Sequence, residues 1–356
     1  MQPILIMYSE SKKDSGLFLN NKEINAEETK ERKITLESKP LLLGIIINDW
    51  CNLDCIMCLD SRHKNQYALS VPALWKIKEL LPYLERIDWQ GGEFFHLDYM
   101  KEIFLFMKGY PHIRHTITTN GLLLNEEWIE LLLNLNTAVT FSIDSPRKET
   151  YEYIRRGGSY DELIERLNLI IDLEQKYKKR LERYLTVVVM KSNYLHLAEF
   201  VEFAKKYGFS SVFFSPVRHL ENEENIFKHI SEDTQKYLSR IMSELKSRFA
   251  ESGIEFKCNL PESHKRPDVV QGGLPIKKEG DLLCDLPWKG MFICAERNGD
   301  IVPDCWCLQP IGNIFQNTLL EAWNSQKMQE YRRRIAAYDM GLCSECYAQD
   351  QYIRSF

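Results

Sequence analysis

The run Cys51-Asn-Leu-Asp-Cys55-Ile-Met-Cys58 is the most informative part of this 356-residue chain. It comes directly after Leu41–Asn48, a predicted β-strand that is almost continuously apolar. The carboxyl ends of parallel strands open onto the crevice in which α/β proteins bind their ligands. Three thiolates this close together can bind three irons of a 4Fe–4S cluster and leave the fourth iron open. The spacing therefore indicates an iron–sulfur site at the end of the first strand.

A zinc site is the main alternative interpretation of this cysteine run. Structural zinc normally has four protein ligands, usually in two closely spaced pairs of Cys or His. The sequence has no second pair nearby, although His63 is a candidate fourth ligand. Three buried thiols without a metal are a further alternative, which would leave the regular spacing unexplained.

Around the cysteine run, short β-rich segments alternate with longer segments of helical period. This alternation is typical of βα units that surround a parallel sheet. Six strands are predicted: Leu41–Asn48, Arg86–Gln90, Arg114–Thr119, Ala138–Ile143, Tyr184–Met190 and Ser211–Val217. We therefore expect an α/β fold in which residues 41–220 form a partial (β/α)6 TIM-like barrel.

The rest of the chain is expected to form three further segments. Residues 1–40 are a polar N-terminal extension, in which a short hairpin is predicted around Asn20 and Asn21. Residues 221–280 are predicted to be a helical connector and a linker, because Pro and Gly accumulate in their second half. Residues 281–356, which hold most of the remaining cysteines, are expected to form a small α+β domain.

Local turn and capping signals locate several of the predicted elements. Ser159 and Thr318 each begin a capping box, and Asn193 is predicted to cap a third helix. Ser231–Phe249 has the pattern of one amphipathic helix. In the C-terminal domain, the dipeptide Asn298-Gly299 predicts a hairpin.

Charge and hydropathy exclude several classes of protein. The chain has 46 Lys and Arg against 51 Asp and Glu, a net charge of −5, so it lacks the basic surplus that binds a nucleic-acid backbone. Its longest apolar run, Leu41–Ile47, is much shorter than a membrane span, and Met1–Glu10 does not resemble a secretion signal. Ten Cys are too few for a disulfide scaffold. We therefore expect a cytoplasmic protein without nucleic-acid or membrane partners.

Several motifs in the same order resemble the radical S-adenosylmethionine (SAM) superfamily. The Cys-x-x-x-Cys-x-x-Cys loop after the first strand is the hallmark of that family. Gln90-Gly91-Gly92-Glu93 follows the second predicted strand and is similar to the family's glycine-rich turn, which binds the amino group of SAM. The resemblance implies that Cys51, Cys55 and Cys58 hold a 4Fe–4S cluster to which SAM binds.

Further positions match where similar enzymes contact SAM. Thr118-Thr119-Asn120-Gly121 and Ser142-Ile-Asp144 end the third and fourth strands, where ribose and methionine contacts occur in the family. Arg155 is similar to the arginine that binds the SAM carboxylate through paired hydrogen bonds. Met57 resembles the position whose backbone contacts adenine, and Asn193 matches a recurrent asparagine. The resemblance thus implies a SAM-binding set of Met57, Gly91, Gly92, Glu93, Asn120, Ser142, Asp144 and Arg155.

These polar positions also have ordinary structural interpretations. Asn120-Gly121 is a common turn dipeptide, and Asp144 is a residue type that caps helices. Arg155 lies beside Arg156 and could be a solvated charge on a helix.

The C-terminal cysteines resemble the auxiliary-cluster domain of radical SAM enzymes, either in the one-cluster form called twitch or in the longer SPASM form. The resemblance implies a second 4Fe–4S cluster with one thiolate on each iron, held by Cys284, Cys305, Cys343 and Cys346. The spacing from Gly299 to Cys305 is one residue longer than usual, so either Cys305 or Cys307 can be the second ligand. A four-cysteine zinc site is the alternative.

The cysteines outside these sets are expected to be small buried hydrophobic side chains. A sharper hypothesis is catalytic: Cys294 or Cys307 faces the substrate and donates a hydrogen atom to a carbon radical.

The resemblance implies reductive cleavage of SAM to a 5′-deoxyadenosyl radical, which removes hydrogen from an unactivated carbon of the substrate. An electron donor such as flavodoxin or ferredoxin would be required. A single auxiliary cluster favours net oxidation or bond formation on a small polar metabolite, such as a sugar or aminocyclitol.

Two other functions remain open at this point. The first is oxidation, cross-linking or epimerisation of a ribosomal peptide. Many enzymes of that kind begin with a leader-binding winged-helix domain, for which residues 1–40 are too short, so a separate protein would recognise the leader. The second is an iron–sulfur or zinc protein that acts as a sensor or scaffold without turnover.

Overall fold

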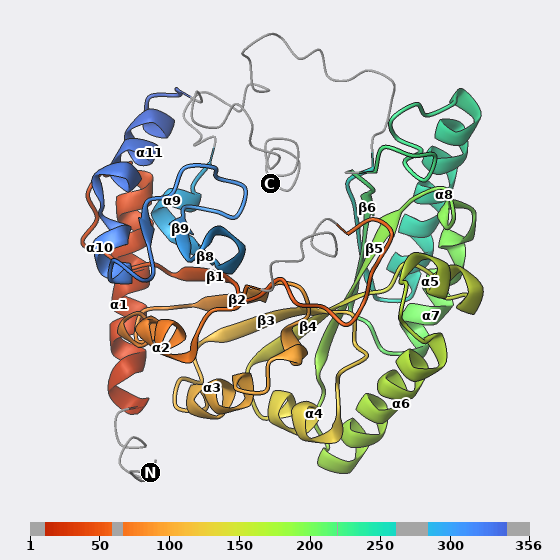
Figure 1. Ribbon diagram of the computed structural model, residues 1–356, viewed down its shortest axis with the longest axis horizontal. Coiled ribbons are helices and arrows are strands. Elements are labelled where there is room, and N and C mark those ends of the chain that lie inside the picture. The colour runs from red at the N-terminus through yellow and green to blue at the C-terminus, as the bar shows by residue number, and fades with distance from the viewer. Residues whose placement is uncertain (1–10, 59–66, 219, 261–283, 340–356) are drawn as a thin grey trace.

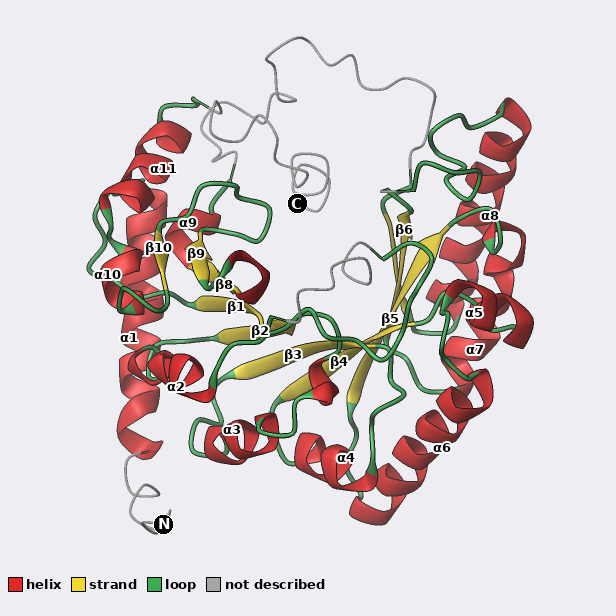
Figure 2. Cartoon of the chain, viewed as in Figure 1, coloured by secondary structure: helices red, strands yellow, loops and turns green. Residues whose placement is uncertain are grey.

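The computed structural model describes residues 11–58, 67–218, 220–260 and 284–339, which form one mostly parallel sheet with helices along its outer face (Figure 1). The strand order is β10-β9-β8-β1-β2-β3-β4-β5-β6-β7. The sheet curves, but its two edge strands do not pair with each other, so the barrel is open (Figure 2). This architecture confirms the predicted partial barrel.

All six predicted strands are present, and each is within two residues of its predicted bounds. They are β1 (Leu42–Ile46), β2 (Arg86–Gln90), β3 (Arg114–Thr119), β4 (Thr137–Ser142), β5 (Glu182–Val189) and β6 (Ser211–Pro216). A seventh parallel strand, β7 (Glu255–Cys258), extends the sheet beyond β6 and was not predicted. Its four residues are largely exposed, so it lacks the apolar pattern that marks a buried strand.

The helices lie mostly in the connections between strands. In chain order they are α1 (Ser11–Lys30), α2 (Val71–Leu74), η3 (Trp75–Glu79), η4 (Phe94–His96), α3 (Met100–Met107), α4 (Glu126–Leu133), α5 (Lys148–Ile154), α6 (Tyr160–Tyr177), η5 (Tyr194–Glu199), α7 (Phe200–Lys206), α8 (Glu232–Glu251), α9 (Leu286–Lys289), η6 (Ala295–Arg297), α10 (Leu319–Trp323) and α11 (Gln326–Ala336). Thr318 and Glu321 form the predicted capping box of α10, and Ser159 accepts the predicted hydrogen bond from Glu162 N at α6. Ser231, for which no cap was predicted, accepts from Thr234 N at the start of α8. Among these described helices, none has the length and apolar character needed to cross a membrane.

The two faces of the sheet differ in polarity, as β2 illustrates. Ile87 and Trp89 are fully buried, and Trp89 packs on Phe104 of α3, so this face is covered by helices. Because side chains alternate along a strand, Arg86, Asp88 and Gln90 lie on the opposite, inner face. The inner face of the open barrel is therefore polar near β2.

The C-terminal region joins the same sheet. Strand β8 (Gly290–Cys294) pairs in parallel with β1, and it forms an antiparallel hairpin with β9 (Asp300–Val302). The predicted turn at Asn298-Gly299 is confirmed, since both residues adopt positive φ angles. A short strand, β10 (Gly312–Asn313), pairs with β9 at the edge of the sheet. Gly44 of β1 lies under the Phe292 ring, where a Cβ atom would be 2.0 Å from ring carbon.

The predicted hairpin at Asn20 and Asn21 is wrong, because both residues lie inside α1. The Asn21 side chain binds the backbone of Lys39, and Asn25 Nδ2 donates to Trp288 O at 2.6 Å. These tertiary contacts override the turn preference of asparagine. They also attach the N-terminal segment to the C-terminal region.

A buried arginine strengthens this attachment. Arg332 of α11 is fully buried, and it donates hydrogen bonds to Ile34 O, Pro287 O and Trp323 O. Burial lowers its pKa to about 9. Residues of the N-terminal segment thus form part of the scaffold that supports α9, which directly precedes β8.

Candidate cofactor site

The first cysteine loop is anchored to the end of α5. Asp54 N donates to Arg156 O at 2.8 Å, and Ile56 N donates to Ile154 O at 3.0 Å. Within the loop, Cys51 is exposed, Cys55 is buried and Cys58 is half-buried. The three thiols thus lie on a loop that follows β1 and whose backbone is held by hydrogen bonds to the end of α5.

The glycine-rich turn after β2 packs directly on this loop. Gly92 N donates to Asn48 O at 2.8 Å, and Glu93 N donates to Trp50 O at 2.6 Å. Gly91 has φ +146°, and a Cβ atom on Gly92 would lie 2.1 Å from Trp50 O. Only glycine fits this close approach of two backbones. The predicted turn is thus held against the residues that precede Cys51.

Glu93 links the turn to the end of β3. Its buried carboxylate accepts hydrogen bonds from Thr119 Oγ1 at 2.7 Å and from Asn120 N at 2.8 Å. Burial raises the pKa of Glu93, and these hydrogen bonds oppose the rise. The side chain thereby fixes the position of Asn120; a direct contact with SAM stays a prediction.

Asn120 connects β3 to the first cysteine. Its Nδ2 donates to Asn52 Oδ1 at 2.9 Å and lies 3.8 Å from Cys51 Sγ, toward which Leu53 N also points. Although the Cys51 side chain is exposed on one side, desolvation by the surrounding protein raises its pKa to about 11, and the Leu53 N–H opposes this rise. Both N–H groups would stabilise a thiolate once a metal replaces the proton. Asn120 is therefore more than a turn residue.

Asp144 and Arg155 form a buried ion pair beside the second cysteine. Arg155 Nε donates to Asp144 Oδ2 at 2.7 Å, and Arg155 Nη1 lies 3.8 Å from Cys55 Sγ. Val188 N donates to the other Asp144 oxygen at 2.8 Å. Burial alone would lower the pKa of Arg155, but Asp144 and Cys55 raise it. Asp144 does not cap a helix, and Arg155 is not a solvated surface charge.

Asn193 does not cap η5 with its side chain, so that prediction is wrong. Instead, its Nδ2 donates to Asp144 O and Val188 O, each at 2.8 Å, and its Oδ1 accepts from Met190 N. The buried amide is used to join the ends of β4 and β5, where the unpaired backbone groups of both strands need partners. Asn193 thus positions Asp144.

Two other predicted SAM contacts lie near this group. Ser142 ends β4 and is the register partner of Thr186 on β5. Met57 lies between two of the cysteines, and its partly buried side chain packs against the apolar cluster of Ile154, Met190 and Val217. Their contacts with SAM stay predictions.

The residues predicted from the sequence therefore lie together in the structure, at the carboxyl ends of strands β1 to β5. Three thiols on one loop, with N–H donors directed at two of the sulfurs, fit an iron–sulfur cluster held by thiolates. Among the described residues, no three His, Cys, Asp or Glu side chains are close enough to bind a single metal ion. His63, the candidate zinc ligand, lies outside the described residues.

The second cysteine group is only partly described. Cys284, Cys305 and Cys307 are half-buried, whereas Cys294 is fully buried at the end of β8. Arg297 donates to the backbone oxygens of Cys307 at 2.7 Å and Cys305 at 3.2 Å, and so fixes the loop after β9. Burial raises the pKa of the Cys305 thiol, and nearby Asp304 and Cys294 raise it further.

The choice between Cys305 and Cys307 as ligand stays open, and so does the proposed hydrogen-donor role of Cys294 or Cys307. The remaining predicted ligands, Cys343 and Cys346, lie outside the described residues.

The prediction of site residues missed the polar inner face of β2. The signal was present in the sequence, because Arg86-Ile-Asp-Trp-Gln90 alternates between polar and apolar residues. The structure places Arg86, Asp88 and Gln90 in the wall of a pocket that also reaches Cys305.

Relatives of this chain include proteins that match most of its length. A serine-type anaerobic sulfatase-maturating enzyme of Bacteroides thetaiotaomicron is 22% identical over 87% of this chain and 80% of its own length. An uncharacterized protein of Archaeoglobus fulgidus is 32% identical, but the match covers 43% of this chain and 36% of that protein.

Solved structures share the fold. SuiB of Streptococcus suis superimposes with a TM-score of 0.65 at 17% identity, covering 88% of this chain and 72% of SuiB. The enzyme anSMEcpe with bound AdoMet gives a TM-score of 0.59 at 18% identity, covering 86% of this chain and 88% of that one.

Two family models match this sequence. The radical SAM superfamily model matches residues 45–232, and the model of the SPASM iron–sulfur cluster-binding domain matches residues 284–347. The first match covers more than half of the chain. This protein therefore belongs to the radical SAM superfamily, as an enzyme that uses SAM and a 4Fe–4S cluster and carries a C-terminal SPASM domain for auxiliary iron–sulfur clusters.

Proposed function

We propose that this enzyme modifies a peptide by removing hydrogen from one of its unactivated carbon atoms. The observation that carries the proposal is the match over 87% of the chain to an enzyme named for sulfatase maturation, whose substrate is a polypeptide. The similarity in fold to SuiB, which has been solved with its precursor peptide SuiA, supports it. The small polar metabolite favoured by the sequence has no comparable support.

The residues of this chain have separable roles in the proposed reaction. Cys51, Cys55 and Cys58 would hold the 4Fe–4S cluster, which when bound supplies the electron for reductive cleavage of SAM and thus a radical that can remove hydrogen. Arg155 would bind the SAM carboxylate with the guanidinium nitrogens that Asp144 leaves available. Asp144 holds that guanidinium in place, and Glu93 holds Asn120 in place.

The substrate class can be tested by deuterium transfer. The reconstituted holoenzyme is incubated with SAM and an extract of deuterium-grown host cells, separated into peptide and small-metabolite fractions. We expect deuterium in 5′-deoxyadenosine, measured by mass spectrometry, only with the peptide fraction. Prior digestion of that fraction with a protease should remove the transfer. Transfer from protease-resistant small metabolites would contradict the proposal.

We propose that the chain holds one auxiliary cluster in addition to the SAM-binding cluster, and this number predicts its iron content. Iron analysis after anaerobic reconstitution should give about 8 irons per chain, four for each cluster. The matched variants Cys305→Ala and Cys307→Ala should differ, because only the variant that loses a ligand should lose auxiliary iron. A wild-type value of about 4 irons would refute the auxiliary cluster.

A further inference from the structure

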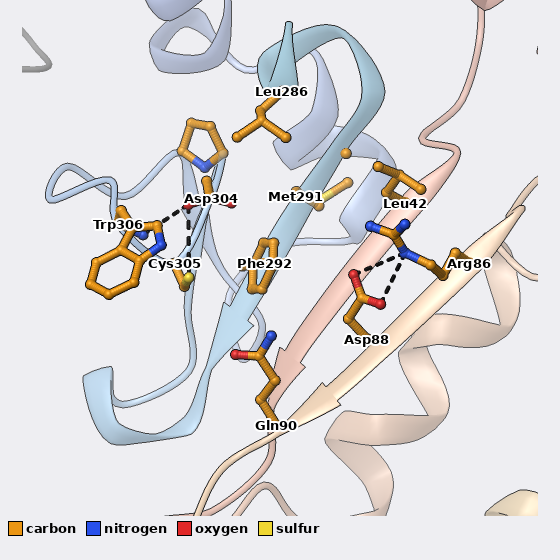
Figure 3. A pocket seen from close by; sticks show the side chains of 12 residues that line it. Leu42, Arg86, Asp88, Gln90, Leu286, Met291, Phe292, Asp304, Cys305 and Trp306 are labelled. Carbon is orange, nitrogen blue, oxygen red and sulfur yellow. Dashed lines mark hydrogen bonds and ion pairs between the residues drawn. The ribbon is translucent and has the colours of Figure 1, made fainter. Parts of the chain in front are cut away.

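A pocket on the inner face of the sheet lies where the barrel meets the C-terminal region (Figure 3). Arg86, Asp88 and Gln90 of β2 form one side, and Phe292 of β8 and Trp306 lie on another. Its volume is about 180 Å³. A cavity of about 150 Å³ can bind benzene, so the pocket has room for one side chain of moderate size.

The charged groups in the pocket wall are not equally available. Asp88 accepts from Arg86 Nε at 2.9 Å and from the Thr116 hydroxyl. Asp304 is almost completely buried and accepts from Trp306 N at 3.1 Å, a donor that stays in place when Cys305 binds a metal as a thiolate. Both carboxylates in the wall are therefore already paired with donors.

Arg86 has donors without a partner among the described residues. Its Nε is paired with Asp88, but within the described residues no acceptor meets its Nη1 or Nη2. The Arg86 side chain is 42% exposed, and Figure 3 shows the guanidinium at the pocket wall between Leu42 and Asp88. Asp88 fixes the orientation of the guanidinium, which leaves its two terminal nitrogens free to bind a carboxylate side by side.

We propose that this pocket binds a carboxylate attached to an apolar group, and that Arg86 recognises the carboxylate. The proposal rests on the proposed function, since it assigns this group to the peptide substrate. The carboxylate can belong to an acidic side chain or to the C-terminus of the peptide. The apolar part would contact the walls formed by Leu42, Leu286, Phe292 and Trp306.

The position of the pocket suits a substrate site. Gln90 lines it and directly precedes the Gly91-Gly92 turn of the SAM site, while Cys305, a proposed auxiliary ligand, lines another part. Arg86 lies at the amino end of β2 and Gln90 at its carboxyl end, so a peptide anchored at Arg86 would have to follow the strand to reach the SAM site. Arg86 would thus determine substrate specificity by binding the carboxylate of the peptide.

Three dipeptides test the proposal on the reconstituted holoenzyme by anaerobic titration calorimetry. The first is acetyl-phenylalanyl-glutamate amide, which has a side-chain carboxylate. The second is acetyl-phenylalanyl-glutamine, which has a terminal carboxylate. The third is acetyl-phenylalanyl-glutamine amide, which has no carboxylate. We expect at least one of the two carboxylate dipeptides to bind. The one with the higher affinity shows whether the pocket recognises a side-chain or a terminal carboxylate.

Two variants separate recognition from general effects of charge. Arg86→Gln should weaken binding of the carboxylate dipeptide by about 10- to 100-fold, as expected for loss of a charge-assisted hydrogen-bonded pair. Arg114→Gln is the matched control, because Arg114 is the register partner of Arg86 on β3 but does not line the pocket. Its Nη2 is engaged by Glu182 and Tyr184. That variant should bind like wild type.

Thermal unfolding of both variants checks that they are folded, and Arg86→Lys, which keeps the charge without the planar fork, should bind with intermediate affinity. The proposal is wrong if wild type binds none of the dipeptides, if the neutral dipeptide binds equally well, or if Arg86→Gln keeps the preference. These outcomes are independent of the deuterium-transfer experiment, which tests whether the substrate is a peptide at all.

Discussion

Replacing Cys55 by alanine is expected to reduce the formation of 5′-deoxyadenosine from SAM to the background level. Cys55 is the most buried of the three thiols in the first loop, and Arg155 lies 3.8 Å from its sulfur. The alanine side chain cannot bind iron, so one iron of the cluster would lose its thiolate ligand. The open iron site that SAM requires should therefore not assemble.

The experiment compares Cys55→Ala with Cys258→Ala after identical anaerobic reconstitution. Cys258 is an exposed cysteine at the end of β7, on the sheet edge farthest from β10, and it has no proposed ligand role. Liquid chromatography of 5′-deoxyadenosine should show activity only in Cys258→Ala. Iron analysis should show about four irons fewer in Cys55→Ala. Wild-type activity in Cys55→Ala would refute the assignment of the first cluster.

The strands and their ends could be predicted because the sequence pattern that specifies a strand lies within the strand itself. A strand such as Arg114–Thr119 carries its β-preference in adjacent residues, and the residues after a parallel strand must lie at one edge of the sheet. The site residues Gly91, Asn120 and Asp144 each follow a different strand of this kind, so their grouping at one edge follows from topology alone.

The features that were not predicted depend on contacts between distant residues. The partner of Asp144 is Arg155, and the amide of Asn193 binds Asp144 O; neither contact is encoded in a local pattern. The same is true of the pairing of β8 with β1, which joins residues about 250 positions apart. Asn193 was predicted to cap a helix because residue propensities describe neighbours in sequence and contain no information about contacts with distant residues.

Substitution of Arg155 by methionine is expected to destabilise the protein by about 3–5 kcal/mol, because the Asp144 carboxylate would stay buried without its counter-charge. Asp144 is completely buried and Arg155 nearly so, so water cannot compensate. Urea unfolding of reconstituted protein measures the change. The double variant Asp144→Asn with Arg155→Met should recover much of the loss, because the amide oxygen can still accept from Val188 N.

The double variant also separates the structural role of Arg155 from its proposed role in SAM binding. If the guanidinium binds the SAM carboxylate, the stable double variant should still bind SAM about 10- to 100-fold more weakly than wild type, measured by equilibrium dialysis. Asp144→Asn alone keeps the guanidinium and should lose less SAM affinity, although it leaves the buried charge of Arg155 without its counter-charge and should also lower stability. Wild-type SAM affinity in the double variant would mean that Arg155 serves only to neutralise Asp144.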